Sequence, residues 1–145
     1  NSKIKKIISN EKKNNIHKTK TYLDYFKKIE LNSKKINLFL KKLKRDNKKV
    51  YALGASTKGN VILQMCKLND NIIKGVYDIN PYKFGRFTPG SKIIIKNEKE
   101  IYKDNPDYLL LLIWHFKKTL KIKLKKFQKT KSKFIWPFPK LRVSK

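Results

Sequence analysis

The chain has 145 residues, a net charge of +28 at pH 7 and an apolar fraction of 39%. Its length suits one domain with a core of its own, and its composition lies outside the disordered range. No apolar run reaches the roughly 18 residues of a membrane span, and no secretory signal follows the N-terminal lysines. Cys66 is alone, which excludes an internal disulfide and a zinc cluster. We therefore expect a cytoplasmic protein without membrane contact.

The first 48 residues are expected to be helical or poorly ordered. Residues 1–20 are rich in Lys and Asn and predict a basic lead-in that is poorly ordered or partly helical, with about one helical turn. Residues 21–48 predict a helical linker in two pieces, the second capped by Ser33. Apolar residues recur at helical spacing in both pieces: Tyr22, Tyr25, Phe26 and Ile29, then Ile36, Phe39, Leu40 and Leu43.

Residues 49–145 alternate strand and helix patterns, which favours a parallel sheet with right-handed crossovers. The predicted fold class is α/β: a Rossmann-like parallel sheet of about five strands with flanking helices, preceded by one or two N-terminal helices. Strands are expected at 50–53, 72–77, 92–95, 107–113 and 133–136, and helices at 59–67, 97–103 and 116–129, with a loop at 80–90. Asn97 is expected to cap the helix at 97–103, and Pro137 and Pro139 are expected to end the last strand.

The first strand ends in a glycine loop, Gly54-Ala-Ser-Thr-Lys-Gly59. Gly54 would let the chain turn sharply, and Gly59 would let helix and sheet approach closely. Backbone amides at the start of the following helix would face an anion. The loop is neither G-x-G-x-x-G nor a P-loop, because Asn60 and Val61 follow the second glycine. The pattern leaves open nucleotide binding and a plain turn that binds nothing.

Ligands bind at the carboxyl ends of the strands in an open parallel sheet, where three loops of this chain should converge. Asp78 ends the second strand and is placed to accept hydrogen bonds from sugar hydroxyls. His115 follows the buried strand, and since no carboxylate partner is evident it is interpreted as a ligand or interface contact rather than a general base. No catalytic residue and no metal ligand is expected. The candidate ligand-binding residues are Ser56, Thr57, Lys58, Gly59, Asn60, Asp78, Asn80, Lys83 and His115.

Four motifs in register carry a family resemblance: GASTKGN, VYDINPYKFGRFTPGSKI, PDYLLLLIWHF and KFIWPFPKLRV. In this order they resemble the C-terminal, Rossmann-like domain of S-adenosylmethionine (SAM)-dependent sugar C-methyltransferases, from about Thr21 to Lys145. The resemblance implies an enzyme with a zinc-binding N-terminal domain, a central SAM-binding domain and this third domain, whose sheet edge would face the central domain and help hold a nucleotide-diphosphate sugar.

The resemblance therefore implies that this chain binds no cofactor itself. SAM is expected on a separate methyltransferase domain or subunit, in cis or in trans, and the chain alone is not expected to transfer methyl groups. Whether the chain is a fragment, a subunit or a degenerate gene product stays open.

Two other functions stay open as alternatives. One is a stand-alone nucleotide-binding module of NAD or CoA type, and the other is a basic nucleic-acid-binding protein. Almost all the positive charge comes from Lys, with only Arg45, Arg86 and Arg142 as arginines. Because sequence-specific nucleic-acid recognition relies on the arginine fork, we do not expect nucleic acid to be the partner.

Overall fold

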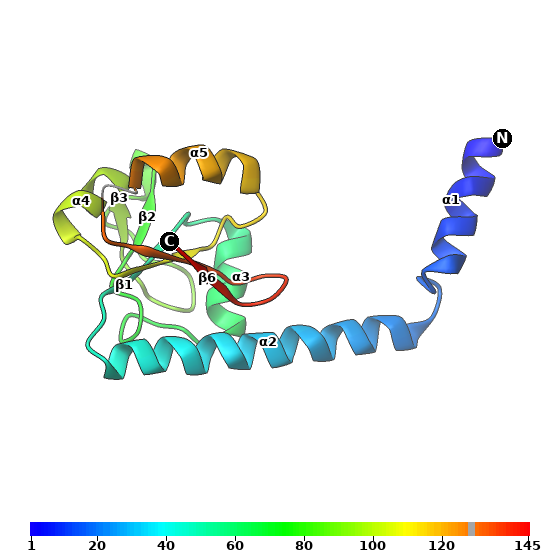
Figure 1. Ribbon diagram of the computed structural model, residues 1–145, viewed down its shortest axis with the longest axis horizontal. Helices are drawn as coiled ribbons and strands as arrows, with labels where there is room; N and C mark the ends of the chain where they lie inside the picture. Colours follow the sequence, from blue (N-terminus) through cyan, green and yellow to red (C-terminus); the bar gives the residue numbers. More distant parts are fainter. Residues whose placement is uncertain (128–129) are drawn as a thin grey trace. The chain divides into compact units, whose positions relative to one another are not determined.

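The computed structural model describes residues 1–127 and 130–145. These form two compact units, residues 1–31 and 32–145. The first unit contains α1 (Ser2–Lys13), whose N-cap Asn1 accepts a hydrogen bond from the amide of Lys3, and the start of α2 (Thr19–Arg45) (Figure 1). The lead-in thus forms a helix of 12 residues rather than a single turn, and none of its residues is buried.

The prediction that Ser33 caps a second helix is wrong. The helix α2 is continuous through Ser33, which is buried within it, and Ile36, Leu40 and Leu43 form its buried stripe. No Gly or Pro interrupts residues 19–45, so nothing breaks the helical hydrogen bonds at the serine. A serine in a helical pattern therefore predicts an N-cap only where the sequence also interrupts the helix.

The second unit is built on a six-stranded sheet in the order β3-β2-β1-β4-β5-β6. The neighbouring strands are parallel except β5 and β6, which are antiparallel. The expected α/β fold with a mostly parallel sheet is confirmed. The strands are β1 (Val50–Leu53), β2 (Val76–Asp78), β3 (Ile95–Asn97), β4 (Tyr108–Leu111), β5 (Lys133–Trp136) and β6 (Arg142–Ser144).

The sixth strand was not predicted. Pro137 follows the last residue of β5, as predicted, but Pro137 and Pro139 both lie in the connection that returns the chain as β6. Two other strands are shifted relative to the expected ranges 72–77 and 92–95. Ile72, Ile73 and Ile93 are buried in loop conformation, so their apolar character reflects burial rather than strand geometry.

Helices cover both faces of the sheet. Besides α2, they are α3 (Thr57–Met65), α4 (Ile101–Asp104) and α5 (Lys117–Phe127), with 3₁₀ turns η1 (Pro81–Lys83) and η2 (Glu98–Glu100). The expected cap at Asn97 is confirmed, because Asn97 and Glu100 form a capping box. The last two residues of the expected helix 116–129 lie outside the described residues.

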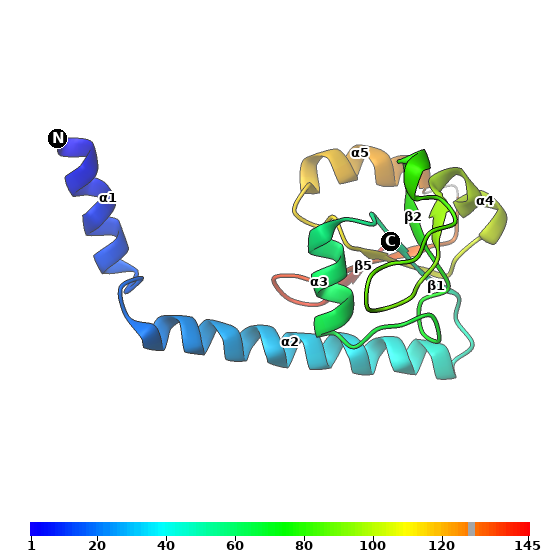
Figure 2. The same cartoon turned by 180° about the vertical axis from the view of Figure 1, so that it is seen from behind.

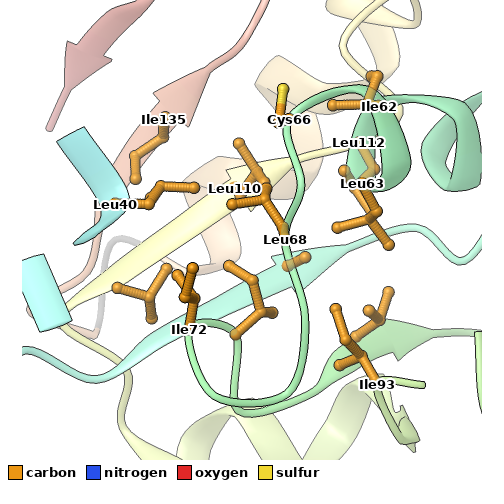
Figure 3. Packing of buried hydrophobic residues seen from close by; sticks show 14 of the residues in the cluster. Leu40, Ile62, Leu63, Cys66, Leu68, Ile72, Ile93, Leu110, Leu112 and Ile135 are labelled. Carbon is orange, nitrogen blue, oxygen red and sulfur yellow. The ribbon is translucent and has the colours of Figure 1, made fainter. Parts of the chain in front are cut away.

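The core of the second unit has two apolar layers, one on each face of the sheet. One layer joins α2 and α3 to Ala52, Leu110 and Ile135. Figure 3 shows Leu110 and Ile135 together with Leu40 of α2 and Leu63 of α3. The other joins α4 and α5 to Leu109 and Leu111. Figure 2 shows α3 and α5 at different sides of the strands. Cys66, which has no second cysteine to pair with, is buried in the first layer as a free thiol.

Candidate functional site

The strand order gives the sheet a switch point between β1 and β4. The chain leaves β1 through α3 to β2 on one side, and it enters β4 through α4 on the other. The ends of three strands are level, because Leu53 pairs with both Tyr77 and Leu111. In such sheets, ligands bind outside the carboxyl ends of the strands at this point, so the loops after β1, β2 and β4 form the candidate site.

The two glycines of the loop sit where a side chain does not fit. Gly54 has φ +95°, and a Cβ atom there would overlap the side chain of Ile113. A Cβ atom on Gly59 would lie 3.0 Å from the carbonyl oxygen of Gly54 and 3.0 Å from the Cβ atom of Leu112. The close approach of α3 to the sheet, which the sequence predicts, therefore depends on Gly59 having no side chain.

The N-terminus of α3 leaves two backbone amides for a ligand. Ser56 is the N-cap, and its Oγ atom accepts from the amide of Gly59 at 3.1 Å. The amide of Ser56 donates to Gly54, and that of Asn60 donates to Ser56. Within the described part of the chain, no acceptor pairs with the amides of Thr57 and Lys58. Of the amides from Ser56 to Asn60, these two remain free to bind an anion.

Asp78 is buried beside the glycine loop. Its Oδ2 atom accepts from the amide of Ala55 at 2.9 Å and from Nζ of Lys83 at 3.3 Å, and its Oδ1 atom accepts from the amide of Asn80 at 2.9 Å. An ionised carboxylate has about four acceptor positions. Contacts within the chain therefore occupy three of them, and they leave one for a ligand hydroxyl.

Asn80 and Lys83 lie in the turn that follows Asp78. Asn80 caps η1, since its Oδ1 atom accepts from the amide of Tyr82 at 3.0 Å. Lys83 ends η1 and donates through Nζ to the carbonyl oxygen of Ala55 at 2.7 Å. The structure thus brings Asp78 and Lys83 to the glycine loop through direct contacts.

His115 lies after β4 and is half-buried between aromatic neighbours. Its ring centroid is 4.2 Å from that of Phe116 and 5.8 Å from that of Trp114, which packs in turn near Phe138. The Nδ1 atom of His115 is buried, and nothing in the described residues is hydrogen-bonded to it; the same holds for Oδ1 of Asn60. No hydrogen bond among the described residues joins His115 to the glycine loop.

Sequence reasoning missed the part played by Ala55. Its amide group donates to Asp78, and its carbonyl oxygen accepts from Lys83. No signal in the sequence marks an alanine for this, because only its backbone takes part.

The described residues contain no cluster of three or more His, Cys, Asp or Glu side chains that could hold a metal ion. In the same part of the chain, no helix combines the length and the apolar character that crossing a membrane requires.

The fold and the switch-point loop define a doubly wound α/β domain. The chain belongs to the C-methyltransferase C-terminal domain family, whose model matches residues 1–139. It is also similar to the C-methyltransferase NovU of Streptomyces niveus, with 29% identity over 140 residues. That match covers 97% of this chain and 33% of NovU, so the chain spans about a third of this relative's length. The family resemblance is confirmed.

Proposed function

We propose that this domain contacts the nucleotide-diphosphate sugar in a SAM-dependent sugar C-methyltransferase, together with a methyltransferase domain in cis or in trans. Membership of the C-methyltransferase C-terminal domain family supports the reaction class. The observation that carries the ligand proposal is the pair of free amides, Thr57 and Lys58, at the switch point of the sheet. The helix dipole adds a partial positive charge there, which favours a phosphate group.

In the proposed complex, the diphosphate meets these two amides and the ammonium group of Lys58, which is exposed. A ligand hydroxyl can donate to the remaining acceptor position of Asp78. Another can accept from the side-chain nitrogen of Asn80, since the Oδ1 atom of Asn80 is already hydrogen-bonded to Tyr82. His115 stays a proposed contact to the ligand or to the methyltransferase domain. The net charge of +28 would attract an anionic ligand over a longer range.

The residues at this loop do not match the glycine pattern of a dinucleotide site, because Ser56 stands where G-x-G-x-x-G has its second glycine. This difference weighs against a stand-alone NAD-binding module. The chain also spans only about a third of the C-methyltransferase NovU. We therefore propose that another domain binds the methyl donor, and a cytoplasmic location remains part of this proposal.

One assay tests whether another domain binds the methyl donor. The 145-residue chain, incubated with SAM and a nucleotide-linked keto-sugar, is expected to form no methylated product. Product formed by this chain alone would contradict the assignment of the donor site to another domain.

Isothermal titration with nucleotide-sugars tests the ligand site, using an assembled C-methyltransferase that contains this domain. Removing one charged hydrogen bond typically costs about 1.5–3 kcal/mol, roughly ten- to a hundredfold in affinity. We expect a loss of this size in Lys58→Ala and in Asp78→Ala. Lys99→Ala is the matched control, because Lys99 is exposed in η2, outside the loops of the site. Unchanged affinity in both site variants would remove this loop from consideration.

A further inference from the structure

The two peptide groups that flank Ala55 in the glycine loop are each held by a side chain. The carboxylate of Asp78 accepts from the amide of Ala55 at 2.9 Å, and the ammonium group of Lys83 donates to the carbonyl oxygen of Ala55 at 2.7 Å. Lys83 and Asp78 also pair with each other at 3.3 Å. The three contacts close a ring around Ala55, which is itself buried.

The chain after β2 folds so that this ring can form. Asp78 is the last residue of β2, and its Oδ1 atom holds the amide of Asn80 at 2.9 Å. Asn80 then caps η1, and Pro81 supplies a backbone angle that suits the first helical position. The short turn brings Lys83 back to the loop that follows β1. Two local turns, rather than a long-range packing contact, thus place the lysine.

We propose that Asp78 and Lys83 are positioning residues, which fix the two peptide groups that flank Ala55 and so hold the amides of Thr57 and Lys58 in the orientation that binds a phosphate group. This inference rests on the proposed function for its ligand. It gives Asp78 and Lys83 a role in holding the loop, in addition to the ligand contact proposed for the remaining acceptor position of Asp78. Because Ala55 lies immediately before the N-cap Ser56, rotation of the peptide group between these two residues, which Lys83 holds, would turn the first residues of α3.

The first measurement needs no ligand. In the 145-residue chain, we expect the amide of Ala55 to exchange with deuterium about tenfold faster or more in Lys83→Met than in the unmodified chain. Asp78→Asn should have a similar effect, since one side of its amide group donates where the carboxylate accepts. The amide of Leu110 in β4 reports on the core and should be unaffected.

A lysine in the same loop provides the matched control. Lys58→Met removes the same charge, but the side chain of Lys58 is exposed, and it forms no hydrogen bond or ion pair with the residues described. Exchange at Ala55 should therefore stay as in the unmodified chain. The side chain of Lys83 is 37% exposed, so Lys83→Met is expected to fold even if Asp78→Asn does not.

The second measurement follows the phosphate-binding amides directly. Inorganic pyrophosphate should shift the NMR signals of Thr57 and Lys58 in the unmodified chain, and Lys83→Met should need about tenfold more pyrophosphate for the same shift while its melting temperature stays within about 2 °C. A merely structural role would not change the titration at constant stability.

The two readouts separate the inference from the proposed function. Exchange at Ala55 that stays unchanged in Lys83→Met would overturn the positioning role, whatever the binding data show. Failure of the unmodified chain, and of an assembly containing it, to bind pyrophosphate or a nucleotide-sugar would contradict the proposed function. Faster exchange at Ala55 together with a weaker pyrophosphate response would support the inference.

Discussion

Replacing Gly59 with valine tests the close contact on which the loop depends. Even a Cβ atom there would lie 3.0 Å from a backbone oxygen of Gly54 and 3.0 Å from Leu112, where ordinary contacts begin at 3.4 Å. A backbone oxygen cannot rotate away as a flexible side chain can. Overpacking of this kind typically costs about 1–3 kcal/mol, while the better helix propensity of valine offsets roughly 0.3 kcal/mol. Destabilisation should therefore dominate.

Thermal unfolding followed by circular dichroism measures the effect. At about 4 °C per kcal/mol for a domain of this size, the net cost should make Gly59→Val melt roughly 3–11 °C below the unmodified chain. Lys58→Val is the control, because it places the same side chain on the exposed neighbouring position and should shift the melting temperature by no more than about 2 °C. A Gly59→Val chain that melts within about 2 °C of the unmodified one would refute the packing argument.

Three further predictions concern stability. Burial raises the pKa of the Cys66 thiol to about 11 from 9.0, so stability should fall as the pH rises from about 9 to about 11, and Cys66→Ala should weaken that fall; an unchanged alkaline profile would contradict this. Burial raises the pKa of Asp104, but hydrogen bonds from Lys96 and Tyr77 outweigh it and hold this pKa below its usual value. The stability that Asp104 contributes should be present above about pH 4 and lost in more acidic solution, and acid titration of Asp104→Asn should show a smaller loss than the unmodified chain. The buried side chain of Asn32 bonds two backbone groups of the β5–β6 connection at 2.7 and 3.0 Å, so Asn32→Leu should lower the free energy of unfolding by about 1–3 kcal/mol per orphaned group, and urea unfolding with no change in midpoint would exclude this role.

The sequence predicted the elements whose signal is steric or local. Gly54 and Gly59 were predicted for a sharp turn and a close approach, and both positions are too tight for a side chain. Asn97 was predicted as a cap and forms one together with Glu100. These signals depend on a few adjacent residues, so one sequence suffices to interpret them.

The features that the sequence did not predict correctly depend on residues elsewhere in the chain. Ser33 has the chemistry of a cap, but it lies within a helix that nothing interrupts. β6 follows two prolines, and its pairing with β5 is decided by a turn that the apolar pattern does not mark. The contacts of Asp78 require the exact turn that brings Lys83 back to Ala55. An acidic residue after a strand can be placed at the edge of the sheet from the sequence, whereas its hydrogen-bond partners are set by the fold.

The central claim is that phosphate groups of a nucleotide-sugar bind at the N-terminus of α3. An NMR titration of the isotopically labelled 145-residue chain with UDP-glucose tests it most directly, since this method detects weak binding to an isolated domain. The account predicts saturable shifts that are largest at the amides of Thr57 and Lys58 and that Gly59→Val abolishes. Shifts confined to the lysine-rich helix α1, or no saturable shift at α3, would contradict it.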